Sequence, residues 1–240
     1  MAPPIDTNED AVHRSPPLGW LAIVFGVLFI GSIAAVFVLT GFAAYPIPYD
    51  PIDQLQNYYM RFPGPVRVVS FLQLGASIPL GLYAVTIVSR LLFLRINVAG
   101  VYIALFGGVA ASVFLGVTGV ATWIVSQPGV AVDAGAMRVA SLLAFASGGF
   151  AHTAALGLLL AGISVPSLAF GVMRPWICLA GLGVAVICEL STISMLFPAA
   201  SFLLPLGRFP ALIWMIAAGF AMPTKRTSPS QGVASSRGCG

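Results

Sequence analysis

The stretch LGWLAIVFGVLFIGSIAAVFVLTGFAA occupies residues 18–44 and contains no Asp, Glu, Lys or Arg. A helix needs about 20 apolar residues to cross the hydrocarbon core of a bilayer, so this stretch is long enough to span one. The apolar core of a secretory signal is only about 7–15 residues long. An uncleaved first span is therefore preferred, and cleavage near Ala43-Ala44-Tyr45 is the alternative.

Similar apolar blocks recur along the 240 residues, of which 59% are hydrophobic and only 8% are charged. A soluble domain carries about 25% charged residues. In lipid every backbone polar group must be paired within the crossing element, so long apolar runs predict helices and not short alternating strands. We expect an all-α, polytopic transmembrane helix bundle of about six spans. The expected spans are residues 18–44, 66–89, 98–125, 139–163, 175–197 and 202–222, in one transmembrane domain over 17–223.

The start of the sixth span is open. Residues 209–222 alone are too few to cross a bilayer, whereas an extension back to residue 202 gives enough length. That extension places Pro205 and Arg208 inside the membrane or at its edge.

The two ends of the chain are polar, and we expect residues 1–16 and 224–240 to be disordered tails. Orientation follows from Lys and Arg near the span ends. With the N-terminus in the cytoplasm, 7 of the 11 basic residues lie on the inner side and 4 on the outer side. We therefore expect a multi-pass protein of the cell membrane with both termini cytoplasmic.

The connection between the first two spans, residues 45–65, has a helical pattern of its own. Asp50 can cap a helix that begins with Pro51, a favoured first-turn residue. The pattern predicts a short amphipathic helix in the outer interface, either as a plug packed on the span ends or as a lid over a ligand. Its apolar residues are Ile52, Leu55, Tyr59 and Phe62.

Polar residues within the apolar blocks are candidates for function, because charges in a bilayer are costly. Counted from the expected outer ends at 1.5 Å per residue, Glu189 lies roughly 13 Å deep, and Arg208 and Gln73 roughly 10 Å deep. Thr118 and Thr192 fall near the same layer. We expect a polar cluster in which Glu189 and Arg208 pair and Gln73 bridges. Such a cluster serves either as a substrate or proton site or only to hold helices together.

His152 is the only histidine within a span, at a depth near that of Glu189. A His–Glu relay is one arrangement that moves protons, and a hydrogen-bonded packing residue is the alternative. The only other histidine is His13 in the tail, which argues against a haem held by two histidines.

Enzyme signatures are missing from the sequence. HExxH, GxSxG, GxxxxGK[ST] and CxxC motifs do not occur, and Asp is absent from every expected span. The basic residues are scattered, which argues against nucleic-acid binding. We expect no enzymatic activity, cofactor or metal, and as partners the lipid bilayer and either a second copy or another membrane protein.

Small residues are spaced for close helix contact. Gly108, Ser112 and Gly116 recur every four residues, and Gly148-Gly149 with His152 mark one face of the fourth block. Such spacing favours packing within the bundle or in a homodimer.

The C-terminal third contains the runs CELST at 188–192 and LPLGRF at 204–209, followed by Ile213-Trp214 and Gly219-Phe220. In these runs the chain resembles uncharacterised bacterial multi-pass membrane proteins of unknown function, over about the last 60 to 80 residues. The resemblance implies a bacterial cytoplasmic-membrane protein with about six helices and no particular activity. Two function classes remain. One is a small transporter or ligand-sensing protein, and the other is a structural or accessory membrane subunit.

Overall fold

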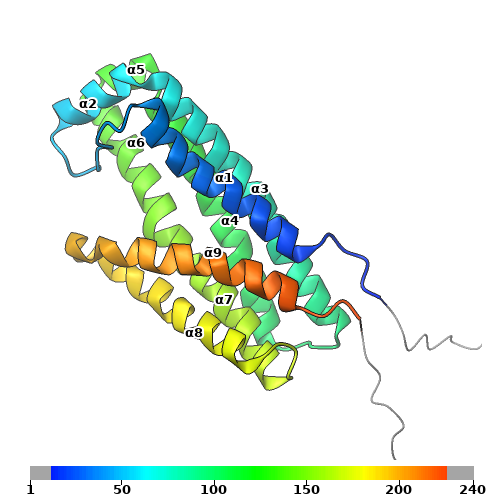
Figure 1. Ribbon diagram of the computed structural model, residues 1–240. Coiled ribbons are helices and arrows are strands. Elements are labelled where there is room, and N and C mark those ends of the chain that lie inside the picture. The colour runs from blue at the N-terminus through cyan, green and yellow to red at the C-terminus, as the bar shows by residue number, and fades with distance from the viewer. Residues whose placement is uncertain (1–11, 226–240) are drawn as a thin grey trace, which may run out of the picture.

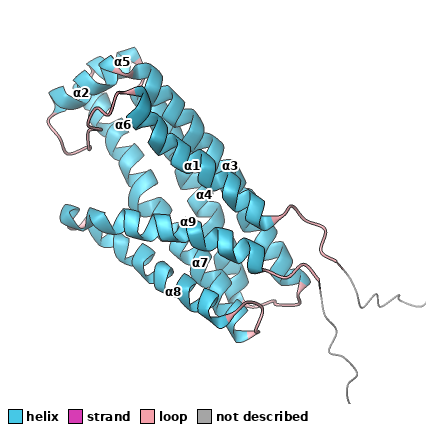
Figure 2. Ribbon diagram, viewed as in Figure 1, coloured by secondary structure: helices cyan, strands magenta, loops and turns pink. Residues whose placement is uncertain are grey.

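The computed structural model describes residues 12–225, which fold into a bundle of helices without a β-strand in that range (Figures 1 and 2). Six helical segments are long and apolar enough to cross a membrane, so the expected all-α bundle of six spans is confirmed. They are Leu18–Leu39, Pro63–Phe93, Ala99–Val125, Ala134–Ala169, Pro175–Met195 and Pro198–Ala221. The protein is thus an integral membrane protein of the multi-pass class.

Nine α-helices and three irregular helical turns make up the described chain. They are α1 (Leu18–Leu39), α2 (Ile52–Arg61), α3 (Pro63–Phe93), α4 (Ala99–Val125), α5 (Pro128–Val132), α6 (Ala134–Ala146), η1 (Ser147–Ala151), α7 (His152–Ala169), α8 (Pro175–Leu190), η2 (Ser191–Met195), η3 (Pro198–Phe202) and α9 (Leu203–Ala221). Arg208 lies inside α9, so the sixth span begins before it.

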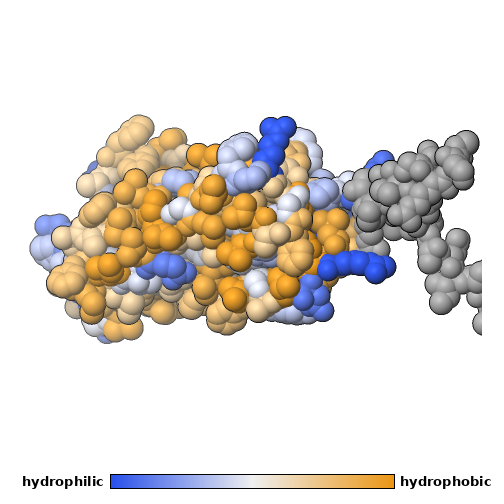
Figure 3. All heavy atoms as spheres, turned by 90° about the horizontal axis from the view of Figure 1, so that it is seen from below, coloured by the Kyte–Doolittle hydropathy of each residue, from blue (hydrophilic) through white to orange (hydrophobic). Residues whose placement is uncertain are grey.

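The surface of the bundle is apolar, as expected for a protein surrounded by lipid. Large side chains such as Phe71, Phe106 and Ile213 are more than 60% exposed. Figure 3 shows hydrophobic side chains covering most of the visible face, with few hydrophilic patches. In water such a surface would drive association, whereas in lipid it is the solvated surface.

Both described ends of the chain lie at one end of the bundle, which we call the terminal end (Figure 1). The backbone N–H of His13 donates to the carbonyl of Thr224 at 2.9 Å, and Val12 forms an antiparallel bridge with Lys225. The expected tails lie mostly outside the described residues. Their described parts, 12–16 and 224–225, run beside each other.

The opposite end of the bundle, which we call the distal end, carries α2 and α5 and the start of α6 (Figure 1). The predicted amphipathic helix is present as α2, and Leu55 and Tyr59 are buried in a small apolar cluster with Ile52 and Phe62 at its edge. The predicted cap is wrong. Asp50 does not bond to the first turn of α2, because its Oδ2 accepts the backbone N–H of Ile47 at 2.9 Å instead.

The fourth span is interrupted in its middle. Residues Ser147–Ala151 form a π-helical turn between α6 and α7, and Gly149 has φ −81° and ψ −109°, outside the helical region. A π turn widens the hydrogen-bonded ring and leaves nearby carbonyls without their usual helical donors. The apolar block at residues 139–163 predicted one regular helix, and this break was not predicted.

The predicted small-residue contacts lie within the chain. A Cβ added at Gly108 would meet Leu159 Cδ1 at 3.1 Å, and the hydroxyl of Ser112 donates to the carbonyl of Ser77 at 2.7 Å. Gly116 also faces Ser77. This stripe of α4 therefore packs against α3 and α7.

Candidate functional site

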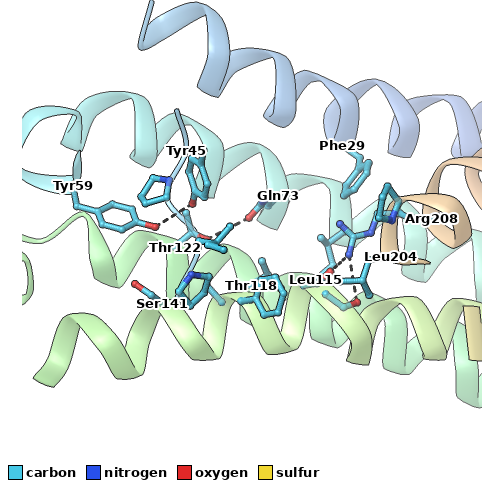
Figure 4. Close-up of a pocket in the computed structure, with 18 of the residues that line it drawn as sticks. Phe29, Tyr45, Tyr59, Gln73, Leu115, Thr118, Thr122, Ser141, Leu204 and Arg208 are labelled. Carbon is cyan, nitrogen blue, oxygen red and sulfur yellow. Dashed lines mark hydrogen bonds between the residues drawn. The ribbon is translucent and has the colours of Figure 1, made fainter. Parts of the chain in front are cut away.

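A cavity of about 350 Å³ lies in the distal half of the bundle, where α1, α3, α4, α6 and α9 meet under the segment before α2 (Figure 4). Three of the six predicted site residues line it, namely Arg208, Gln73 and Thr118. The remaining lining residues are Phe29, Tyr45, Pro46, Ile47, Pro48, Tyr59, Leu115, Thr122, Ser141, Ala144, Phe145, Gly148, Gly149, Leu204, Pro205 and Phe209.

Among the described residues that line the cavity, Arg208 is the only charged one, and α9 carries it to one end of the cavity (Figure 4). Its Nη2 donates to the backbone carbonyl of Gly148, and lies 3.4 Å from both the carbonyl of Gly149 and Oγ1 of Thr153. The guanidinium carbon lies 5.5 Å from the centre of the Phe29 ring, within cation–π distance. All of these partners are neutral, so the positive charge is oriented but not neutralised.

The other two guanidinium nitrogens of Arg208, Nε and Nη1, make no such hydrogen bonds to the described residues. Nε of Arg208 is buried without a hydrogen-bond partner among the described residues, and Nη1 also makes no hydrogen bond within that part of the chain. A buried arginine normally has most of its five N–H donors satisfied. Arg208 therefore lines the cavity with the two N–H groups of Nη1 unused within the described chain, whereas its Nε–H is buried.

The π turn explains how Arg208 is held. Its Gly148 carbonyl accepts a hydrogen bond from the guanidinium, whereas the Gly149 carbonyl also accepts the backbone N–H of His152 and, at 2.8 Å, the hydroxyl of Thr153. Gly148 lies so close to α4 that an added Cβ would be 2.6 Å from Thr118 Cγ2. The turn can approach α4 this closely because glycine has no side chain. The break in the fourth span and the position of Arg208 thus belong to one arrangement.

The other end of the cavity is polar but uncharged. Oγ1 of Thr122 lies 3.5 Å from Oε1 of Gln73, and Tyr59 donates its hydroxyl to Tyr45 at 3.2 Å (Figure 4). Ser141 also lines this region. Burial raises the pKa of Tyr59 well above its usual value, so its hydroxyl stays protonated and remains a donor at neutral pH.

The segment from Tyr45 to Asp50 forms the distal wall of the cavity. Arg138 on α6 holds it by donating to the carbonyls of Pro48 and Asp50, the latter at 2.8 Å. A second hollow of about 340 Å³ lies on the other side of this segment and shares Tyr45 and Pro46 with the first. The segment therefore separates an outer hollow from the inner cavity.

His152 lies beside the cavity and does not line it. Its Nδ1 is 2.9 Å from the carbonyl of Ala111, which requires the proton on Nδ1 and leaves Nε2 as an acceptor. Nε2 is buried without a partner among the described residues. The imidazole stacks on Phe29 with ring centres 6.4 Å apart, and Phe29 in turn contacts Arg208.

Glu189 and Thr192 lie away from the cavity. Glu189 is exposed on α8, and its Oε1 covers Gly157 of α7, where an added Cβ would be 2.8 Å away. Thr192 donates its hydroxyl to the Glu189 carbonyl at 2.6 Å. The expected ion pair between Glu189 and Arg208 is not formed, because the bonds of Arg208 to described residues go to α7 and the π turn.

Several cavity residues were missed by sequence reasoning. Thr122 follows Thr118 by one helical turn and could have been found from that spacing. The Gly148-Gly149 pair in mid-span was a signal for an irregular helix. Phe29, Leu204 and Phe145 carried no signal, because apolar residues are common throughout the spans.

Among the described residues, no group of three or more His, Cys, Asp or Glu side chains could hold a metal ion. No protein-family model matches the chain, and no curated protein or solved structure matches it.

Proposed function

We propose that this membrane protein binds a small solute in the cavity at Arg208, as a transporter or a ligand-sensing protein. The observation that carries the proposal is an intramembrane cavity of about 350 Å³ with one charged residue and several neutral donors in its wall. Small-molecule sites have volumes of about 300–1,000 Å³ and combine apolar walls with a few polar groups. An ionisable residue that faces a cavity within the membrane is a mark of such sites.

Access from the distal end supports this proposal. The outer hollow and the inner cavity share the wall formed by Tyr45 and Pro46. That wall is an irregular segment held by Arg138, so a change of its conformation would join the two spaces. We propose that the segment from Tyr45 to Asp50 acts as a gate and that the distal end faces away from the cytoplasm, with both termini cytoplasmic. We also propose a bacterial cytoplasmic membrane as the location.

A structural or accessory subunit is the second candidate, and Glu189 favours it. Its carboxyl group is exposed on a span whose other exposed neighbours, such as Val186 and Leu190, are apolar. A carboxyl group facing lipid is costly unless it is protonated or reaches the interface, and a partner helix with a donor would also satisfy it. In this role the Arg208 cluster would only hold α9 against the fourth span.

Cysteine accessibility separates the two candidates. Gln73→Cys and Thr122→Cys would be made in a chain lacking Cys178, Cys188 and Cys239, with Leu80→Cys as the control. Leu80 lies on the same helix as Gln73 and is fully buried. A membrane-impermeant thiol reagent added on the side of the distal end should label the two cavity positions and leave the control unlabelled. Protection of both cavity positions from either side would favour the structural subunit.

A further inference from the structure

We propose that the cavity ligand is a small amphipathic monocarboxylate whose carboxylate binds the free side of the Arg208 guanidinium. This inference rests on the proposed function and adds the chemical class of the solute.

The charge of the lining is the first argument. Arg208 contributes one positive charge, and the other lining residues are neutral. Its described partners are carbonyls and a hydroxyl, which orient the guanidinium without cancelling its charge. A ligand with one negative charge would neutralise the site, whereas a cation would be repelled in a medium of low dielectric constant.

The second argument is the geometry of the free donors. Nη1 carries two N–H groups and makes no hydrogen bond to the described residues, while Nη2 is occupied by Gly148 and its neighbours. The N–H groups of Nη1 can donate to a carboxylate oxygen, and such a bond between two charged groups is stronger than one between neutral groups. The π turn fixes the plane of the guanidinium before any ligand arrives.

The volume and the middle of the cavity define the rest of the ligand. About 350 Å³ is near the lower end of small-molecule sites, which suits a compact acid and not a whole phospholipid. The lining also includes apolar side chains, among them Leu115, Phe145 and Leu204. An aromatic or short aliphatic body therefore fits between the two polar ends.

A dicarboxylate is disfavoured by the far end of the cavity. Gln73, Thr122 and Tyr59 are neutral there, and no second cation lines the wall. Arg138, the nearest basic residue of the gate, already donates to the carbonyls of Pro48 and Asp50. The far end suits a neutral hydrogen-bonding group or a bound water.

The test compares three ligands that differ only in the head group: 3-phenylpropanoate, 3-phenylpropanamide and 3-phenylpropylamine. Binding is measured by equilibrium dialysis with the full chain in lipid nanodiscs. We expect the carboxylate to bind about tenfold or more tightly than the amide, because a hydrogen bond to an ionised group is stronger than one to a neutral group. The amine should bind most weakly.

Three variants locate the site. Arg208→Gln should remove the preference for the carboxylate, and Arg208→Lys should keep part of it. Because Arg208 also holds the π turn, Ala144→Phe provides a second variant that fills the cavity without touching that contact, and it should abolish binding of all three ligands. Arg174→Gln, at an exposed arginine outside the cavity, is the matched control and should bind as the unmodified chain does.

The outcomes separate this inference from the proposed function. Equal binding of amide and carboxylate, both lost in Ala144→Phe, would overturn the carboxylate assignment and leave the solute site standing. Failure of every ligand to bind at millimolar concentration, together with unlabelled cysteines in the cavity, would overturn both. Palmitate added to the nanodisc bilayer tests whether the carboxylate ligand comes from the lipid and not from the aqueous phase. Competition by palmitate that is lost in Arg208→Gln would support the carboxylate site and assign lipid as its supply.

Discussion

Arg208 Nη2 lies 3.4 Å from the carbonyl oxygen of Gly149, the residue whose ψ of −109° interrupts the helix between α6 and α7. The arginine of the sixth span thus contacts an irregular turn in the fourth, whose Gly149 carbonyl also accepts the hydroxyl of Thr153. This contact joins two parts of the chain 59 residues apart and places the only charge of the cavity at its wall.

Substitution of Gly148 should test how closely the irregular turn packs on α4. Gly148→Ala would place its methyl group 2.6 Å from Thr118 Cγ2, which is too close for two carbon atoms. We therefore expect a loss of about 1–3 kcal/mol in unfolding free energy. Unfolding in mixed detergent micelles measures it.

The matched control for this substitution is Gly183→Ala in α8. Gly183 has nothing within 4 Å of an added Cβ and lies in a regular helix. It should gain up to about 1 kcal/mol from helix propensity. Equal effects of the two substitutions would contradict close packing at Gly148.

The gate should open when its arginine is removed. Arg138→Gln loses the donors to the Pro48 and Asp50 carbonyls, so the segment before α2 should become mobile. We expect faster labelling of Gln73→Cys by the impermeant thiol reagent. Arg67→Gln is the control at the same end, because Arg67 bonds to Ser126 and not to the gate. Unchanged labelling in Arg138→Gln would show that the segment does not limit access.

The contact of the N-terminal segment with the bundle should depend on pH. His13 lies within 2.9 Å of Ser15 Oγ and 3.1 Å of Ser89 Oγ, and burial and the nearby Arg90 lower its pKa below 6.5. The neutral ring is therefore the bound form. Binding of this segment should be complete above pH 6.5, weaken as the pH falls below it, and level off under the lowered pKa.

Spin labelling at Val12→Cys measures this transition, because a released segment moves faster. In a His13→Asn chain the mobility should not change between pH 8 and pH 5. A transition that persists in that variant would have to be assigned to another group.

Glu189 should be separable from the solute site. Its carboxyl lies over Gly157, outside the cavity, and its backbone carbonyl accepts the Thr192 hydroxyl. Glu189→Gln should therefore leave ligand affinity unchanged and alter the unfolding free energy by less than about 0.5 kcal/mol. Loss of a larger complex on size-exclusion chromatography would instead assign Glu189 to a protein interface.

The sequence predicted the class of fold because the solvent acts on whole segments. Each span must be apolar over about 20 residues, and that requirement is visible in composition alone. The helix α2 was predicted for a similar reason, because Leu55 and Tyr59 recur at helical spacing and are buried on one side.

The candidate site was predicted only in part, because depth does not fix direction. Gln73, Thr118 and Arg208 were placed in one layer, and the structure brings all three to one cavity. Glu189 was assigned to the same layer, yet it is exposed and lies over Gly157 of α7, outside the cavity. Whether its side chain points inward depends on the rotation of α8 about its axis, which a uniformly apolar helix does not specify.

The irregular turn also bears on how such a cavity can arise and be lost. A π turn accommodates one more residue than a regular turn, and each residue turns an α-helix by about 100°. Deletion of one residue near Gly148 would restore a continuous helix and rotate α6 by that amount, carrying Ser141 and Phe145 away from Arg208. A single codon thus separates this span from an ordinary membrane helix, so the proposed solute site could be gained or lost in one mutational event while all six spans were retained.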